Sequence, residues 1–168
     1  RAILSTLLFH GLRREELCRL RKCDIQLRSG VQHLRVHGKG NKLRYVPIHP
    51  GTADLLDDYL RCSGHATSAD APLFLPLRDN RRGPDACAAL TPNGVYALLK
   101  VYAKAAQLDV SQVSPHSLRT TAATNALVHD ADIAKVQEWL GHANIATTRM
   151  YDRRRTRPSD SPTFKVAF

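Results

Sequence analysis

The sequence predicts a mainly helical domain with one small antiparallel β-sheet, an α+β fold. Apolar residues recur at helical spacing along most of the 168 residues, and the period changes to two between Val31 and Ile48. Hydrophobic residues make up 43% and charged residues 24%, which are ordinary values for a chain that buries a core. Disorder and membrane spanning are therefore poor interpretations, and the sequence contains no repeat, low-complexity tract or second domain.

Two helices are expected at the start of the chain. The first begins within the first few residues and ends near Gly11, because glycine favours the left-handed turn that closes a helix. The second runs from Arg14 to about Lys22. The residues after it lead to a turn at Ser29-Gly30.

A β-hairpin is expected next. Val31 to His37 and Arg44 to Ile48 alternate apolar and polar side chains, which is typical of half-buried strands. Between them lies Gly38-Lys39-Gly40-Asn41-Lys42, a glycine-rich turn sequence. The hairpin therefore has a basic tip.

The rest of the chain predicts helices with recognisable start signals. Residues 51–62 form an acidic helix, residues 73–75 a short apolar run, and residues 78–89 a polar loop. A cap residue followed by proline opens two further helices. The expected helices span about 92–107, 115–128, 132–140 and 144–151.

The chain is strongly basic. It has 25 Lys and Arg residues against 15 Asp and Glu, a net charge of +10, and residues 1–50 alone carry +8. Residues 51–110 carry −1 and residues 111–168 carry +3. An acidic partner is indicated; nucleic acid is the commonest, although membrane surfaces and acidic proteins also fit.

The cysteines and the first residue indicate cellular context. The four cysteines form no CxxC pair and follow no signal peptide, so they are expected to be reduced, buried thiols in a cytoplasmic protein. The sequence begins with Arg1 and not with methionine, and apolar residues at helical spacing are already present in its first few residues. We therefore expect the chain to be the C-terminal domain of a longer protein.

A phosphate site is suggested by Ser114-Pro115-His116-Ser117-Leu118-Arg119. His116 and Arg119 lie three residues apart and share one face of a helix start, where the helix dipole also favours anions. An arginine fork can bind two phosphate oxygens. Surface solvation with simple capping is the alternative for this motif alone.

Three further positions offer polar side chains. His142 lies in a Leu-Gly-His stop between two helices, and Tyr151 follows nine residues later. Arg13 lies at a helix junction, where Glu16 could hold its guanidinium or form only an exposed pair. Lys39 lies at the hairpin tip. Taken singly, these residues fit packing or surface roles equally well.

The ordered set GLRxxEL, GKGNK, HxxR, LGH and a tyrosine nine residues later resembles the catalytic domain of tyrosine recombinases. This is the lambda-integrase and Xer-like family of site-specific DNA recombinases, and the resemblance extends from Ala2 to Asp152. It implies a catalytic domain over 1–152, with an N-terminal core-binding domain outside the fragment. It also implies six catalytic residues: Arg13, Lys39, His116, Arg119, His142 and Tyr151.

The resemblance implies a role for each of these residues. The two arginines grip the scissile phosphate, and the tyrosine forms a 3′-phosphotyrosyl link to DNA. Lys39 protonates the leaving 5′ oxygen, His116 assists proton transfer at the tyrosine, and His142 hydrogen-bonds the phosphate. The reaction needs no metal, ATP or other cofactor. Arg14 follows Arg13 at a usually small or apolar position, so it is the alternative arginine.

Flanking basic residues are candidates for contacts with the backbone of double-stranded DNA. They are Lys42, Arg44, Arg153, Arg154 and Arg155, although the arginines after Tyr151 fit a solvated basic linker equally well. Phe164, Val166 and Phe168 alternate in the tail, residues 153–168, which could add an edge strand to a sheet. The family implies a tetramer on DNA, so the tail is expected to dock in cis or on a neighbouring protomer.

Two other functions compete with this interpretation. A type IB topoisomerase uses similar chemistry as a monomer, and a non-catalytic module could keep the basic face alone. The Xer-like spacing of LGH to the tyrosine and the tail after the tyrosine favour a recombinase over the topoisomerase, and the intact set of six residues argues against the non-catalytic module. The recombinase is therefore the preferred interpretation. It fits phage, transposon, integron and chromosome-resolution enzymes alike, acting at the bacterial nucleoid and not at a membrane.

Overall fold

The computed structural model describes residues 1–38, 40, 42–63, 68–76, 88–153 and 163. Within them the chain forms seven α-helices, a short 3₁₀ helix and three strands, which confirms the predicted α+β fold. Their bounds are α1 Ala2–His10, α2 Arg14–Arg19, η1 Lys22–Asp24, β1 Ile25–Arg28, β2 Val31–His37, β3 Leu43–Pro47, α3 Pro50–Cys62, α4 Pro92–Ala105, α5 Pro115–Val128, α6 Ile133–Leu140 and α7 Ile145–Arg149.

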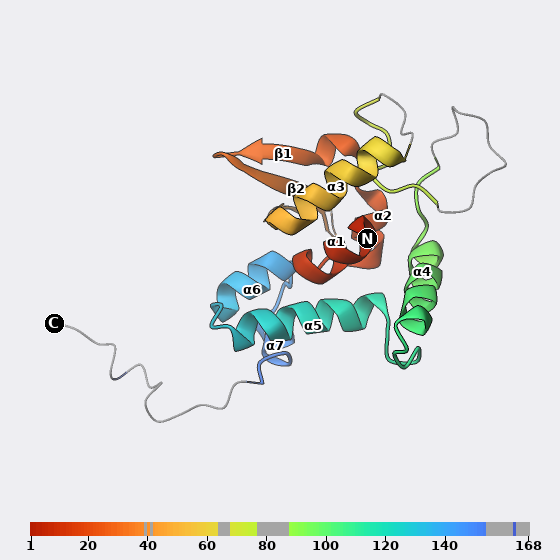
Figure 1. Cartoon of the computed structure of the whole chain (residues 1–168). Coiled ribbons are helices and arrows are strands. Elements are labelled where there is room, and N and C mark those ends of the chain that lie inside the picture. Colours follow the sequence, from red (N-terminus) through yellow and green to blue (C-terminus); the bar gives the residue numbers. More distant parts are fainter. Residues whose placement is uncertain (39, 41, 64–67, 77–87, 154–162, 164–168) are drawn as a thin grey trace.

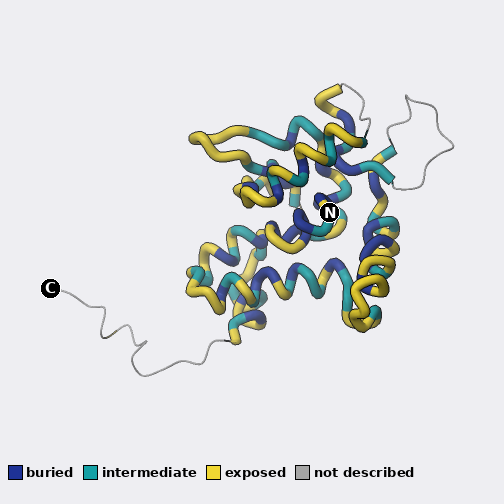
Figure 2. Tube along the Cα trace, in the orientation of Figure 1, coloured by how far each residue is buried: buried dark blue, intermediate teal, exposed yellow. Residues whose placement is uncertain are grey.

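Helix α1 lies at the centre of the molecule. The sheet and α3 cover one side of it, α5 to α7 cover the other, and α4 stands at the edge (Figure 1). Figure 2 shows the buried segments gathered around α1 and along the inward faces of α4 and α5. Leu7, Leu12 and Leu17 are fully buried there. Helices α5 and α6 share a smaller core with Tyr151, and Trp139 packs against both cores.

The sheet has one strand more than predicted. Its order is β1-β2-β3, and both pairs are antiparallel. The residues of strand β1 were expected to be a connection to the turn; the burial along β1 does not alternate, and Leu27 is 74% exposed. Ser29 and Gly30 both have positive φ, 48° and 77°, so they form the tight turn that pairs β1 with β2.

The other predicted helices begin and end close to the observed bounds, except at the ends of α2 and α7. Helix α2 ends at Arg19 because Leu20 is extended (φ −59°, ψ 136°), and a separate 3₁₀ turn follows. Helix α7 ends at Arg149, so Tyr151 lies in the turn after it. The predicted hairpin tip at Lys39, most of the loop 78–89, and the tail strand at 164–168 lie outside the described residues.

The predicted caps hold the helices that carry the candidate site. Ser114 Oγ accepts a hydrogen bond from the amide of Ser117 (3.0 Å) at the start of α5. Asn144 Oδ1 accepts from the amide of Ala146 (2.8 Å) at the start of α7. Gly11 and Gly141 end α1 and α6 with φ of 55° and 67°. These caps bring two helix C-termini together beside α5.

Candidate active site

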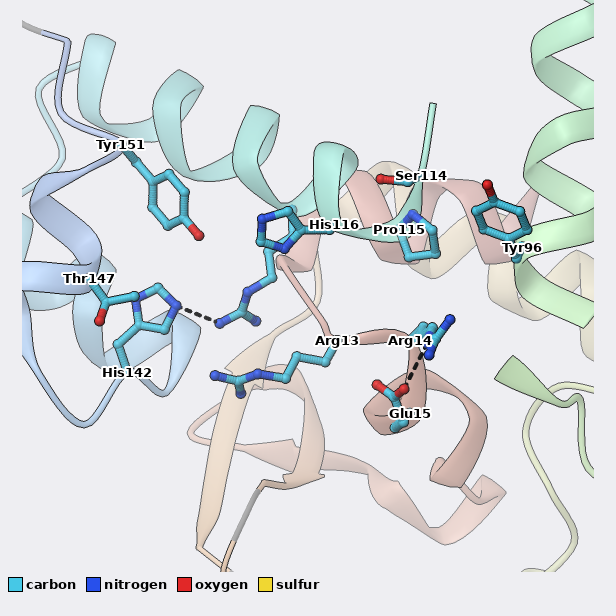
Figure 3. A pocket seen from close by; sticks show the side chains of 11 residues that line it. Arg13, Arg14, Glu15, Tyr96, Ser114, Pro115, His116, His142, Thr147 and Tyr151 are labelled. Atoms are coloured by element: carbon cyan, nitrogen blue, oxygen red, sulfur yellow. Dashed lines mark hydrogen bonds and ion pairs between the residues drawn. The ribbon is translucent and has the colours of Figure 1, made fainter. Parts of the chain in front are cut away.

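Five of the six predicted catalytic residues line one cavity of about 450 Å³. They are Arg13, His116, Arg119, His142 and Tyr151. In Figure 3 the Arg13 guanidinium, the imidazoles of His116 and His142, and the Tyr151 hydroxyl all point into this space. The sixth residue, Lys39, lies outside the described residues, as do Arg154 and Arg155.

Arg13 is placed by the glycine turn that precedes it. A Cβ at Gly11 would lie 2.9 Å from the Leu140 side chain and 3.2 Å from the Trp139 ring, and φ is 55°, so a larger residue here would strain the packing of α1 on α6. The Arg13 guanidinium donates from Nη1 to Glu16 Oε1 (2.8 Å), and its amide donates to Glu16 Oε2 (2.8 Å). Glu16 therefore fixes both ends of Arg13.

Arg14 lies at the other end of the cavity. Its Nε donates to Glu15 Oε1 (2.7 Å), on the side where Tyr96 and Ser114 form the wall (Figure 3). Arg13, in contrast, reaches toward His142 (Figure 3). The geometry thus favours Arg13 over the alternative, Arg14, as the arginine at the cluster of histidines and tyrosine.

Arg44 has a different position from the one expected of a contact to flanking DNA. Its side chain is only 13% exposed, and it donates from Nη1 and Nη2 to the two Glu16 oxygens (2.9 and 2.8 Å). Its Nε donates to the Trp139 carbonyl (3.0 Å). We therefore reinterpret Arg44 as an internal partner of Glu16. Lys42 and Arg153 are exposed, as a DNA contact requires.

Glu16 is a buried carboxylate held by two arginines. Its side chain is 4% exposed. Burial alone would raise the pKa of Glu16, but the hydrogen bonds from Arg44 and Arg13 outweigh it, so the pKa lies below its usual value. Glu16 is therefore ionised and balances part of the positive charge around the cavity.

Arg119 is the buried centre of the site. It is 4% exposed and donates from Nη1 to the Gly11 carbonyl and from Nη2 to the Leu140 carbonyl (2.7 Å). These oxygens belong to the C-terminal ends of α1 and α6, where the helix dipoles favour a cation. Burial, together with nearby Arg13, lowers the pKa of Arg119 to about 10, so the guanidinium remains charged at neutral pH.

His142 and Tyr151 close the cavity opposite Arg13. His142 Nε2 lies 3.0 Å from Arg119 Nη2, and its Nδ1 lies 3.0 Å from Thr148 Oγ1. Burial and the nearby arginines lower the pKa of His142 to about 4, so its ring is neutral at pH 7. The rings of His142 and Tyr151 are tilted against each other at 5.9 Å, and Tyr151 is 9% exposed.

His116 is the exposed member of the set, in the first turn of α5. Sequence reasoning missed Thr148, a buried hydroxyl six residues after His142, and the internal role of Arg44. The alternation of β3 gives a signal for Arg44, since it shares a face with Val46, but nothing in the sequence marks the contact of Thr148.

Metal and membrane features were also searched for in the described residues. There, no three His, Cys, Asp or Glu side chains lie close enough together to hold a metal ion. None of the helices described is long and apolar enough to cross a bilayer.

The comparisons with known proteins agree on one family. The model of the phage integrase family matches residues 1–157. The tyrosine recombinase XerC of Pelobacter propionicus is 40% identical over 151 residues, which cover 90% of this chain and 46% of the relative. XerA of Thermococcus kodakarensis is 39% identical over 153 residues, covering 91% and 50%. The chain thus spans about half the length of these curated relatives.

Solved structures give the same result. A crystal structure of XerA recombinase is 32% identical with a TM-score of 0.72, and the match covers 95% of this chain and 54% of that one. A pre-cleavage complex of the XerH site-specific recombinase with its difH substrate is 28% identical, with a TM-score of 0.73 and coverage of 90% and 41%.

Proposed function

The chain belongs to the phage integrase family, and we propose that it is the catalytic domain, residues 1–152, of a site-specific DNA recombinase. The observation that carries this proposal is the convergence of two arginines, two histidines and one tyrosine on a single cavity. The tyrosine recombinases among its relatives, one of them solved on its DNA substrate, support the same reaction class.

The cavity is suited to a phosphodiester. Arg119 is fixed in its plane by two backbone carbonyls, and Arg13 is fixed by Glu16. Donors fixed in this way need no reorganisation when negative charge builds up on the non-bridging oxygens of the transition state. Loss of one such donor costs about 3 to 4 kcal/mol of transition-state stabilisation in comparable sites.

Tyr151 is the proposed nucleophile. Its oxygen attacks the scissile phosphorus, and the bond from phosphorus to the 5′ oxygen breaks, which leaves a 3′-phosphotyrosyl link. A tyrosine hydroxyl, with a pKa of about 10, must lose its proton on attack. The exposed ring of His116 at the cavity supports its role as the acceptor of that proton.

The leaving 5′ oxygen needs a proton, which we assign to Lys39 on the strength of the family resemblance. Gly38 and Lys42, the described residues on either side of the hairpin tip, line a second cavity with Arg13 and His142. A later attack by a free 5′ hydroxyl on the phosphotyrosine reseals the strand. The bond energy is retained in the link, so ATP is not consumed.

A nicked suicide substrate tests this assignment. The protein should form a covalent DNA adduct that survives denaturation, and Tyr151→Phe should abolish it, because the hydroxyl that attacks the phosphorus is removed. The matched control is Tyr102→Phe, an exposed tyrosine on α4, which should keep the adduct. An adduct that persists in Tyr151→Phe would overturn the choice of nucleophile. DNA binding without an adduct would favour a non-catalytic module.

We also propose that protomers assemble as a tetramer on double-stranded DNA at the bacterial nucleoid, exchanging their C-terminal tails. An apolar groove of about 510 Å³ between α1, α5 and α6 supports this, with Leu8, Phe9 and Trp139 among its lining residues. The tail carries Phe164, Val166 and Phe168, which match such a groove chemically. The proposed occupant is the tail of a neighbouring protomer.

A further inference from the structure

The ring of His142 is held between two partners of different chemistry. Arg119 Nη2 lies 3.0 Å from its Nε2, and Thr148 Oγ1 lies 3.0 Å from its Nδ1. A guanidinium has only donors, so Nε2 must be the acceptor in the first contact. A neutral imidazole carries one proton, which is therefore on Nδ1 and is donated to Thr148 Oγ1.

Thr148 is well placed to enforce this arrangement. It is fully buried on α7, while His142 lies in the loop before that helix. The backbone of His142 is held separately, because its carbonyl accepts from Gln137 Nε2 (3.0 Å) and its amide donates to the Gln137 carbonyl (3.1 Å). With the backbone fixed, Arg119, which has only donors, requires a lone pair on Nε2, and the Thr148 hydroxyl reinforces this tautomer by accepting the Nδ1 proton.

Burial and the charges around His142 keep the ring neutral. Burial of the ring disfavours an imidazolium most, and Arg119 on α5, Arg13 before α2 and Arg44 on β3 act in the same direction, whereas Glu16 acts in the opposite one. Tyr151, which follows α7, packs its ring against that of His142. A neutral ring with its proton on Nδ1 offers Arg119 a lone pair, whereas the other tautomer would direct an N–H at a guanidinium N–H.

We propose that Thr148 is a positioning residue that fixes His142 as the Nδ1–H tautomer, so that Nε2 holds the Arg119 guanidinium in orientation before DNA binds. The tautomer is a property of the free protein. Its effect on catalysis rests on the proposed function. The inference adds a residue and a tautomer to the site, and in the free protein it assigns both ring nitrogens of His142 to protein partners, Arg119 and Thr148.

The direct test is the ring nitrogen spectrum of the ¹⁵N-labelled protein at pH 7.5, with the His142 signals identified by their loss in His142→Asn. The wild type should show Nδ1 protonated and Nε2 unprotonated. Thr148→Val should shift the ring toward the Nε2–H tautomer, and Thr148→Ser should restore the wild-type pattern. The matched control, Thr147→Val, should leave it unchanged, because Thr147 lines the same cavity but the ring nitrogens of His142 contact Arg119 and Thr148.

Adduct formation on the suicide substrate is the second measurement. Thr148→Val should slow it on the order of tenfold, because a displaced guanidinium no longer meets the phosphate, and Thr148→Ser should recover the rate. Thermal unfolding of each variant shows that the comparison is between folded proteins. An unchanged tautomer in folded Thr148→Val overturns the proposal. Absence of an adduct in the wild type instead overturns the proposed function and leaves the tautomer assignment standing.

Discussion

His10 is a buried histidine outside the cavity that makes stability depend on pH. Its Nε2 accepts from the His49 amide (3.0 Å), and its Nδ1 lies 3.2 Å from the Thr6 carbonyl, so the ring must be neutral. Burial lowers the pKa of His10 from 6.5 to about 4. Below pH 6.5 the unfolded chain therefore binds a proton that the folded chain does not, and stability falls as the pH drops toward 4.

We expect this histidine to contribute a loss of about 3 kcal/mol between pH 6.5 and 4, from 1.36 kcal/mol per pKa unit. Urea unfolding of His10→Gln should show lower stability than wild type at pH 7 but a shallower decline toward acid. His129→Gln is the matched control, since His129 also contacts the carbonyl four residues earlier but is exposed. A His10→Gln variant that keeps the wild-type pH dependence would contradict this account.

At the scale of elements, the ion pair between Glu16 and Arg44 joins α2 to β3. Replacing Arg44 with Met leaves a buried carboxylate with one arginine fewer, and removal of one partner from a buried pair typically costs about 3 to 5 kcal/mol. Arg44→Lys keeps the charge but loses the two parallel hydrogen bonds. Because Glu16 also holds Arg13, we expect Arg44→Lys to slow adduct formation roughly 10²-fold.

Arg35→Lys provides the comparison for this prediction. Arg35 on β2 donates from Nε to the buried carboxylate of Asp24 (2.8 Å), a second arginine–carboxylate pair that does not line the cavity with Arg13. The Arg35→Lys variant should have a lower free energy of unfolding in urea, but its folded form should keep the wild-type rate of adduct formation. The role assigned to Arg44 is wrong if Arg44→Lys and Arg35→Lys show the same rate.

The limits of sequence-based prediction also lie at the scale of elements. The site residues were predicted from the order and spacing of five motifs that resemble one family, and caps and glycines predicted only the helix boundaries around them. Strand β1 could not be predicted, because its pairing depends on a serine at positive φ and its Leu27 faces outward. The position of Arg44 could have been predicted, since strand alternation places it on the inner face with Val46. The contact of Thr148 depends on how α7 packs against the loop before it, which no local pattern encodes.

At the scale of the whole molecule, the proposed tail exchange predicts how protomers assemble. A chain lacking residues 161–168 should bind DNA but form complexes of lower mass by analytical ultracentrifugation, because the apolar tail no longer reaches a neighbour. Leu8→Glu should have the same effect, since Leu8 is 39% exposed and lines the groove. A charge there disfavours an apolar occupant without disturbing the core.

The result separates three ways in which the tail could dock. Leu27→Glu places the same charge on β1, an edge strand of the sheet, where Leu27 lies outside the groove. If it alone lowers the mass of the complexes, the tail extends the sheet and the groove assignment is wrong. If deletion lowers the melting temperature of the free chain but leaves the mass on DNA unchanged, the tail docks in cis. Exchange between protomers requires loss of mass in both the deletion and Leu8→Glu, with Leu27→Glu assembling as the wild type does.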